Sequence, residues 1–103
     1  GVAGVKYLEG SLTVIYKAPF EKTWNASVSA LKELPSTIEK KEHDITKGEI
    51  WGKFPDGRPI NLNLEYQTAE ETKVQIRVGA LGDREASMIV KEKIRKQLFG
   101  QGQ

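Results

Sequence analysis

The fold is decided by residues 60–78, which read INLNLEYQTAEETKVQIRV. Apolar and polar side chains alternate over residues 60–66 and again over 74–78, and a period of two is typical of half-buried β-strands. Tyr66 has the spacing of a core residue. The polar run at residues 68–71 predicts a turn between the two halves. Residues 60–78 therefore predict two strands, each with one apolar face.

Three further segments predict strands. Residues 8–16 and 49–54 both alternate between apolar and polar side chains. The sequence Pro55-Asp56-Gly57 then predicts a hairpin turn, because proline fixes φ, aspartate bonds to its own backbone and glycine accepts a positive φ. The charged stretch 36–44 predicts an exposed edge strand, since charged residues, lysine above all, keep such edges from pairing with other molecules.

Two segments have the spacing of amphipathic helices. Pro19 suits the first turn of a helix, and Pro35 ends it, because the residue before proline is pushed out of the helical region. Asp83 predicts the N-cap of a second helix that ends at Gly100. The apolar faces comprise Phe20, Trp24, Val28, Leu31 and Leu34 in the first helix, and Ala86, Val90, Ile94 and Leu98 in the second.

The length of the chain and the order of these segments predict one domain. A chain of 103 residues with 38% hydrophobic residues supports one core. We expect residues 1–6 to be a flexible lead-in, residues 7–99 to form a single α+β domain and residues 100–103 to be a frayed tail. The order β-α-β-β-β-β-α predicts a two-layer sandwich, in which a mainly antiparallel five-stranded sheet carries both helices on one face.

The other face of that sheet is expected to meet water. Trp51 is the least ordinary residue there, because tryptophan is seldom placed on a water-facing strand, although it can pack under the stems of Lys53 or Arg77, or under a loop or tail. On the covered face, Gly52 leaves room for a bulky helix residue such as Trp24. The candidate interaction surface comprises Trp51, Lys53, Asn61, Asn63 and Arg77, with Glu65 and Gln75 on the same face.

Composition excludes several classes of partner. Sixteen Lys and Arg against fourteen Asp and Glu leave a formal charge of +2. This balance is too even for a nucleic-acid footprint, so we expect no nucleic-acid partner. No apolar run approaches the roughly 18 residues that a membrane span needs. There is no cysteine for a disulfide, which is compatible with more than one compartment.

No pattern of catalytic or metal-ligating residues stands out. His43 is the sole histidine, and strand geometry turns it away from its two acidic neighbours, so a metal or acid–base site is not expected. Ser29 and Lys32 have the SxxK spacing of serine acyl-enzymes without the motifs that accompany it. The loop at residues 79–82 could hold an anion, but Asp83 caps the same N–H groups. We expect no enzymatic activity, no cofactor and no metal.

Several short motifs match one bacterial family in order along nearly the whole chain. They are Gly10-Ser11-Leu12, Ala18 with Trp24, Ala30-Leu31, Gly48-Glu49-Ile50, Asp56-Gly57 and, most specifically, the junction from Ile76 to Asp83 followed by Ser87 and Val90. On these motifs the chain resembles domain of unknown function 3568. Members of that family typically resemble small lipoproteins, with a lipobox cysteine before a spacer rich in glycine and alanine like residues 1–5. The resemblance implies a periplasm-facing place in the bacterial cell envelope, with a lipid anchor in the precursor that this chain lacks.

Two functional hypotheses follow. The first is a non-enzymatic interaction or accessory module of the envelope, whose open sheet face around Trp51, Asn61, Asn63 and Arg77 contacts a protein partner. The second is a small-molecule or lipid-binding domain with a groove between the helices and the sheet, indicated by the aromatic-rich first helix. The oligomeric state is left open by the sequence.

Overall fold

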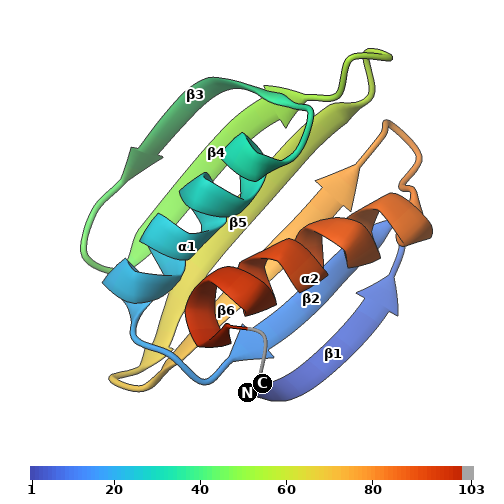
Figure 1. Ribbon diagram of the computed structural model, residues 1–103. Helices are drawn as coiled ribbons and strands as arrows, with labels where there is room; N and C mark the ends of the chain where they lie inside the picture. Colours follow the sequence, from blue (N-terminus) through green and yellow to red (C-terminus); the bar gives the residue numbers. More distant parts are fainter. Residues whose placement is uncertain (101–103) are drawn as a thin grey trace.

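A computed structural model describes residues 1–100, and in it a six-stranded sheet carries two helices on one face (Figure 1). The order of strands across the sheet is β1-β2-β6-β5-β4-β3, and every neighbouring pair is antiparallel. β1 and β3 are therefore the two edges. The elements are β1 (Val2–Leu8), β2 (Ser11–Tyr16), α1 (Phe20–Glu33), β3 (Thr37–His43), β4 (Lys47–Lys53), β5 (Pro59–Thr68), β6 (Glu71–Val78) and α2 (Arg84–Phe99).

The α+β class and the antiparallel sheet are confirmed, but the expected five strands and their order are wrong. Residues 8–16 are not one strand, because Glu9 and Gly10 form a two-residue turn between β1 and β2 with φ of 50° and 83°. Positive φ at both positions is the signature of a type I′ hairpin. The turn changes the parity of the side chains: Leu8 lies opposite Ser11 on one face, whereas Leu12, Val14 and Tyr16 are buried on the other, so the apparent alternation over residues 8–16 hides the turn.

The expected flexible lead-in is also wrong. Residues 2–8 form β1, which pairs with β2 from Val2 opposite Tyr16 to Leu8 opposite Ser11. The Lys17 N–H donates to the Gly1 carbonyl at 2.9 Å, which ties down the start of the strand. Residues 101–103 of the expected tail lie outside the described part of the chain.

Both helices pack their predicted apolar faces on the core, although Val28 of α1 and Leu34 at its C-cap are only partly buried. α2 begins as expected, with the Asp83 carboxylate accepting from the Ala86 N–H at 3.0 Å. The buried Tyr16 hydroxyl donates to the Lys91 carbonyl at 2.9 Å, which joins β2 to α2, and burial raises the pKa of Tyr16. The least exposed large side chains of the core are Leu12, Val14, Tyr16, Leu31, Ile50, Ile60, Leu62, Val74, Ile76, Val78, Val90 and Ile94.

The glycine that accommodates Trp24 is Gly48 and not Gly52. A Cβ at Gly48 would lie 2.6 Å from Trp24 Cζ3, so the indole ring occupies the space of the missing side chain. A Cβ at Gly52 would instead meet the Thr37 carbonyl at 2.5 Å. Both glycines lie on the covered face, so side-chain alternation is compatible with either one. Which glycine contacts Trp24 depends on the position of α1 along β4.

Three further expectations concern an edge strand, a turn and the burial of Tyr66. The edge strand over residues 36–44 is confirmed as β3, and the Pro55-Asp56-Gly57 turn is confirmed, with Gly57 at φ 93° and its N–H donating to the Phe54 carbonyl at 2.9 Å. The core position expected for Tyr66 is wrong, because its side chain is 43% exposed. Tyr66 pairs with Thr72 close to the β5–β6 turn, at the end of the hairpin.

Candidate functional site

The sheet face opposite the helices, hereafter the open face, carries the predicted interaction residues. The register places side chains in rows that run across the strands. Trp51 of β4 lies opposite Asn61 of β5, which lies opposite Arg77 of β6. In the next row Glu49 lies opposite Asn63, which lies opposite Gln75. The sheet thus brings residues from three strands onto one surface.

A chain of polar side chains joins the two rows. Asn63 Nδ2 donates to Asn61 Oδ1 at 2.8 Å, and Asn61 Nδ2 donates to Glu49 Oε2 at 2.9 Å and to the Ile50 carbonyl at 3.3 Å. Both amides are half-buried. Because these bonds restrict the side chains, the open face presents its donors and acceptors in a fixed arrangement.

Trp51 is half-buried beside these amides. The group over its ring is Lys40 of the neighbouring strand β3, with Nζ 4.9 Å from the ring centroid. Lys40 was not among the residues expected to cover Trp51, which were Lys53 and Arg77. Lys53 Nζ lies 3.4 Å from Glu39 Oε2, and both side chains are about half exposed.

Arg77 lies on the open face but its guanidinium points along the strand to two loops. Nη1 donates to the Glu9 carbonyl at 2.9 Å, and Nη2 donates to the Ala80 carbonyl at 2.7 Å. Arg77 therefore links the β1–β2 turn to the loop that precedes α2. We separate this structural role from the contact surface formed by Trp51, Asn61 and Asn63.

Sequence reasoning missed two residues of this site, Glu49 and Lys40. Glu49 has the same strand parity as Trp51, so alternation alone would have found it. Lys40 follows a register shift between Ile38 and Lys40, and such irregularities leave no reliable signal in a sequence. A shallow depression of about 530 Å³ adjoins the row on the side of Glu49, Asn63 and Gln75.

His43 belongs to the covered side of the sheet. Its Nε2 lies 2.8 Å from Glu21 Oε1, and its ring stacks on Trp24 with centroids 4.2 Å apart. His43 is an exposed residue, as expected, but its contacts with Glu21 and Trp24 of α1 were not indicated by the sequence. Over residues 1–100, no group of three His, Asp or Glu side chains could hold a metal ion.

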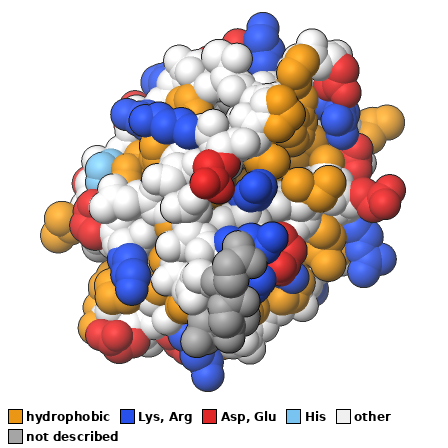
Figure 2. All heavy atoms as spheres, viewed as in Figure 1, with side chains coloured by type: hydrophobic (Ala, Val, Ile, Leu, Met, Phe, Trp, Pro, Cys, Tyr) orange, Lys and Arg blue, Asp and Glu red, His pale blue; other side chains and the backbone are white. Residues whose placement is uncertain are grey.

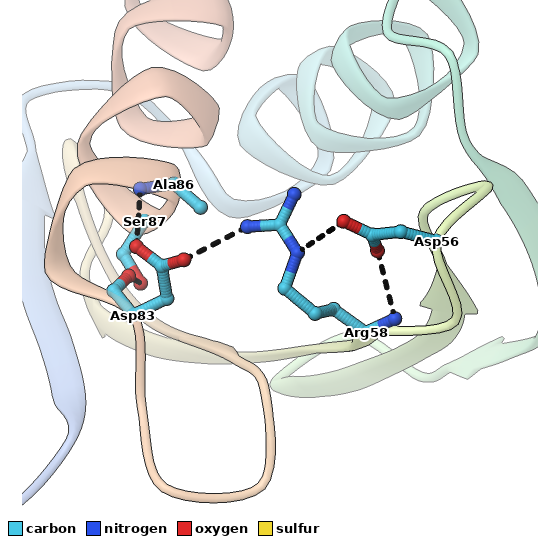
Figure 3. Close-up of polar contacts among 5 residues, drawn as sticks. All are labelled: Asp56, Arg58, Asp83, Ala86 and Ser87. Carbon is cyan, nitrogen blue, oxygen red and sulfur yellow. Dashed lines mark hydrogen bonds and ion pairs between the residues drawn. The ribbon is translucent and has the colours of Figure 1, made fainter.

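A second hollow lies at the end of the domain where both helices approach the β4–β5 turn. Arg58 binds two carboxylates here, donating to Asp56 Oδ2 and Asp83 Oδ2 at 2.8 Å each (Figure 3). Backbone N–H donors hold the pKa of both aspartates below the usual range, Arg58 for Asp56 and Ala86 for Asp83. Because two carboxylates engage Arg58, its charge is not available to a ligand anion.

Beside this cluster the hollow is mostly apolar, with a volume of about 550 Å³. Figure 2 shows hydrophobic side chains gathered in the upper right of the helix side, where this hollow opens. Ile89 is 54% exposed at its rim. The residues that line it are Leu34, Pro35, Phe54, Pro55, Asp56, Arg58, Asp83, Glu85, Ala86 and Ile89. We call it the helix-end groove.

Comparison with known proteins gives a family and no activity. No helix within residues 1–100 is long and apolar enough to span a membrane. No curated protein matches the chain. A sequence model of one family matches residues 1–97, which is nearly the whole chain and includes every strand and most of α2. The chain therefore belongs to the family described as Protein of unknown function (DUF3568).

Proposed function

We propose that this protein is a non-catalytic interaction module of the bacterial cell envelope and that it binds a protein partner through the open face. The observation that carries the proposal is a half-buried tryptophan beside an ordered chain of two amides and a carboxylate, on a sheet face that no helix covers. Tryptophan surrounded by polar groups is the usual composition of a binding hot spot.

The charges of the open face favour a polar protein surface over a polyanion. Lys53 pairs with Glu39, and Lys73 Nζ lies 3.6 Å from Glu65 Oε1. Positive and negative groups are interspersed, so no strong field of one sign draws in nucleic acid. A partner that offers hydrogen-bonding groups around a recess for the indole fits this surface best.

The proposed location of the domain in the bacterial envelope is based on the family resemblance. In this proposal a lipid anchor upstream of Gly1 holds the domain on a membrane, facing the periplasm. Because residues 2–8 form β1 and do not act as a spacer, the link from the anchor would enter the fold at the sheet edge. Fatty-acid labelling and fractionation of the full precursor test this, and unlabelled protein in the cytosolic fraction would refute it.

The helix-end groove supports a second candidate function, the binding of a small apolar ligand. Its volume lies within the range of small-molecule sites, and most of its lining is apolar. The groove is open to solvent at the ends of the helices, and the core between the helices and the sheet is filled by side chains at most 8% exposed. A ligand would therefore bind at the surface of the domain.

One paired experiment separates the two candidates. Immobilised protein is used to capture partners from envelope extract, with Trp51→Ala on the open face and Ile89→Ser at the groove as matched variants. If the open face is the site, Trp51→Ala lowers the capture of a specific protein by roughly tenfold or more, as expected for a hot-spot tryptophan. Ile89→Ser then leaves capture unchanged. The reverse pattern would place the protein contact at the groove, and an apolar fluorescent probe that Trp51→Ala still binds but Ile89→Ser does not would support the small-ligand function.

A further inference from the structure

The outer edge of β1 presents unpaired main-chain groups. In a two-residue hairpin the residues that flank the turn, here Leu8 and Ser11, form a hydrogen-bonded pair, and such pairs alternate along the strands. Lys6 therefore bonds to Thr13 of β2, whereas the main-chain groups of Val5 and Tyr7 point away from the sheet. Nothing within residues 1–100 pairs with that edge.

The side chains of this edge give little protection against pairing, and the register shift between Val2 and Gly4 interrupts only its first residues. β1 contains no proline, and Lys6 is its only charged residue. Val5 is 48% exposed on the helix side and Leu8 is 55% exposed on the open face. Edge strands that remain solitary usually carry several charges, a proline or a covering loop. The β1 edge is thus available for strand addition.

We propose that β1 pairs antiparallel with β1 of a second copy of this chain, so that two sheets become one. This inference concerns assembly and stands independently of what the open face binds. Residues with outward main-chain groups must face each other, which every symmetric centre from Gly4 to Tyr7 satisfies, and a centre at Val5 gives the longest overlap. Centring on Lys6 would place that lysine opposite its own copy, which is unfavourable.

Centring on Val5 places Lys6 opposite Gly4 of the second copy, so like charges are kept apart. It also gives the longest overlap of the two strands, with residues 4–6 of both copies in regular register and Tyr7 and Leu8 of one copy meeting the register shift at residues 2–3 of the other. The two Val5 side chains meet on the helix side and cover each other's exposed apolar area. The sequence of β1 is therefore suited to a second copy of itself.

The dimer would double the open face while keeping all four helices on one side. A pair of strands supplies less contact area than a standard stable interface, so we expect a reversible, concentration-dependent dimer. Sedimentation velocity over about 1 µM to 1 mM should show the mass rise from 11.5 kDa toward twice that value. A monomer throughout this range would overturn the proposal.

Substitution at Val5 tests the edge itself. Val5→Lys places two lysines opposite each other across the two-fold axis, and the dimer should disappear. Glu42→Gln on the opposite edge changes the net charge by the same one unit and should leave the dimer intact. Thermal unfolding of the dilute monomer checks that both variants fold. Loss of the dimer in both, or in neither, would contradict an interface at β1.

Disulfide trapping tests the register, because the chain contains no cysteine of its own. Opposite residues of a hydrogen-bonded antiparallel pair have Cα atoms about 5.5 Å apart, within the range of a disulfide. Val5→Cys should give a covalent dimer on mild oxidation. Lys6→Cys, whose opposite residue is Gly4, and Lys41→Cys on β3 should give no covalent dimer. Cross-linking that is strongest at Lys6→Cys, or equal at all three positions, would refute the Val5 register.

Discussion

The two edges of the sheet differ in composition and in what holds them. In β3, five of the seven residues carry ionisable side chains, namely Glu39, Lys40, Lys41, Glu42 and His43. In β1 the only charged residue is Lys6. Each edge has a side-chain contact with a helix: the His43 ring of β3 stacks on Trp24 of α1, and Arg84 of α2 lies over the Tyr7 ring of β1. Both strands contain a register shift, so the difference between the edges lies in charge, which protects β3 against pairing more strongly than β1.

The largest expected effect comes from disrupting the contact between the β1–β2 turn and the loop that precedes α2. A Cβ at Gly82 would lie 2.3 Å from Gly10 Cα in the β1–β2 turn, and Gly82 has a φ of 88°. Gly82→Ala should lower the free energy of unfolding by about 3 kcal/mol, because backbone strain and a backbone clash act together.

Gly79→Ala is the matched control in the same loop. Gly79 has a φ of 81°, but a Cβ there meets nothing within 4 Å. We expect a loss of only about 1 kcal/mol, from the positive φ alone. Urea unfolding of both variants measures the difference. Equal losses would show that the β1–β2 turn does not depend on contact with this loop.

The next largest effect comes from disrupting the contact between β3 and α1. His43→Ala removes the ring that stacks on Trp24 and the contact with Glu21, and should cost about 1 kcal/mol of unfolding free energy. Lys41→Ala, on the same strand and exposed, should change stability by less than about 0.5 kcal/mol. Chemical denaturation compares the two, and similar losses would mean that β3 gains nothing specific from His43.

A third prediction concerns acid, which should act on the β3–β4 turn and spare the β1–β2 turn. The Asp44 carboxylate accepts from the N–H groups of Thr46 and Lys47 at 2.8 and 2.9 Å, and these bonds lower the pKa of Asp44. Because the folded value lies below the unfolded one, the stabilisation is present above about pH 4 and is lost as pH falls through the folded pKa.

Amide hydrogen exchange between pH 2 and pH 6, corrected for intrinsic rates, measures this local effect. Protection at Thr46 and Lys47 should fall with acid, and Asp44→Asn should weaken that dependence. The Ser11 amide, at the turn between β1 and β2, serves as the control and should show no such step. A step of equal size at both turns would reveal global acid unfolding in place of a local change.

The smallest effect concerns the contact between β3 and the open face. Lys40→Met removes the cation over Trp51 and should lower the free energy of unfolding by about 0.5 kcal/mol. With Trp24→Phe as the background, Trp51 is the only tryptophan, and its emission reports the change in its surroundings. An unchanged spectrum would show that Lys40 does not occupy the indole face in solution.

The contact surface was partly predictable because strand parity is local. Alternation alone places Trp51, Asn61 and Asn63 on the face away from the core, and the structure places them there together. The bond from Asn61 to Glu49 and the position of Lys40 over Trp51 depend on which residues stand opposite one another. Register is set by turns and bulges in several strands at once, so it could not be taken from one segment.

The sequence by itself determined the elements whose physical cause is local: α1 between Pro19 and Pro35, the Asp83 cap of α2, the Pro55-Asp56-Gly57 turn and the apolar face of β5 and β6. The tertiary structure alone decided that residues 2–8 form an edge strand, that Gly48 receives Trp24 and that His43 reaches α1. These features depend on contacts between residues far apart in the chain, whose energies no local pattern encodes.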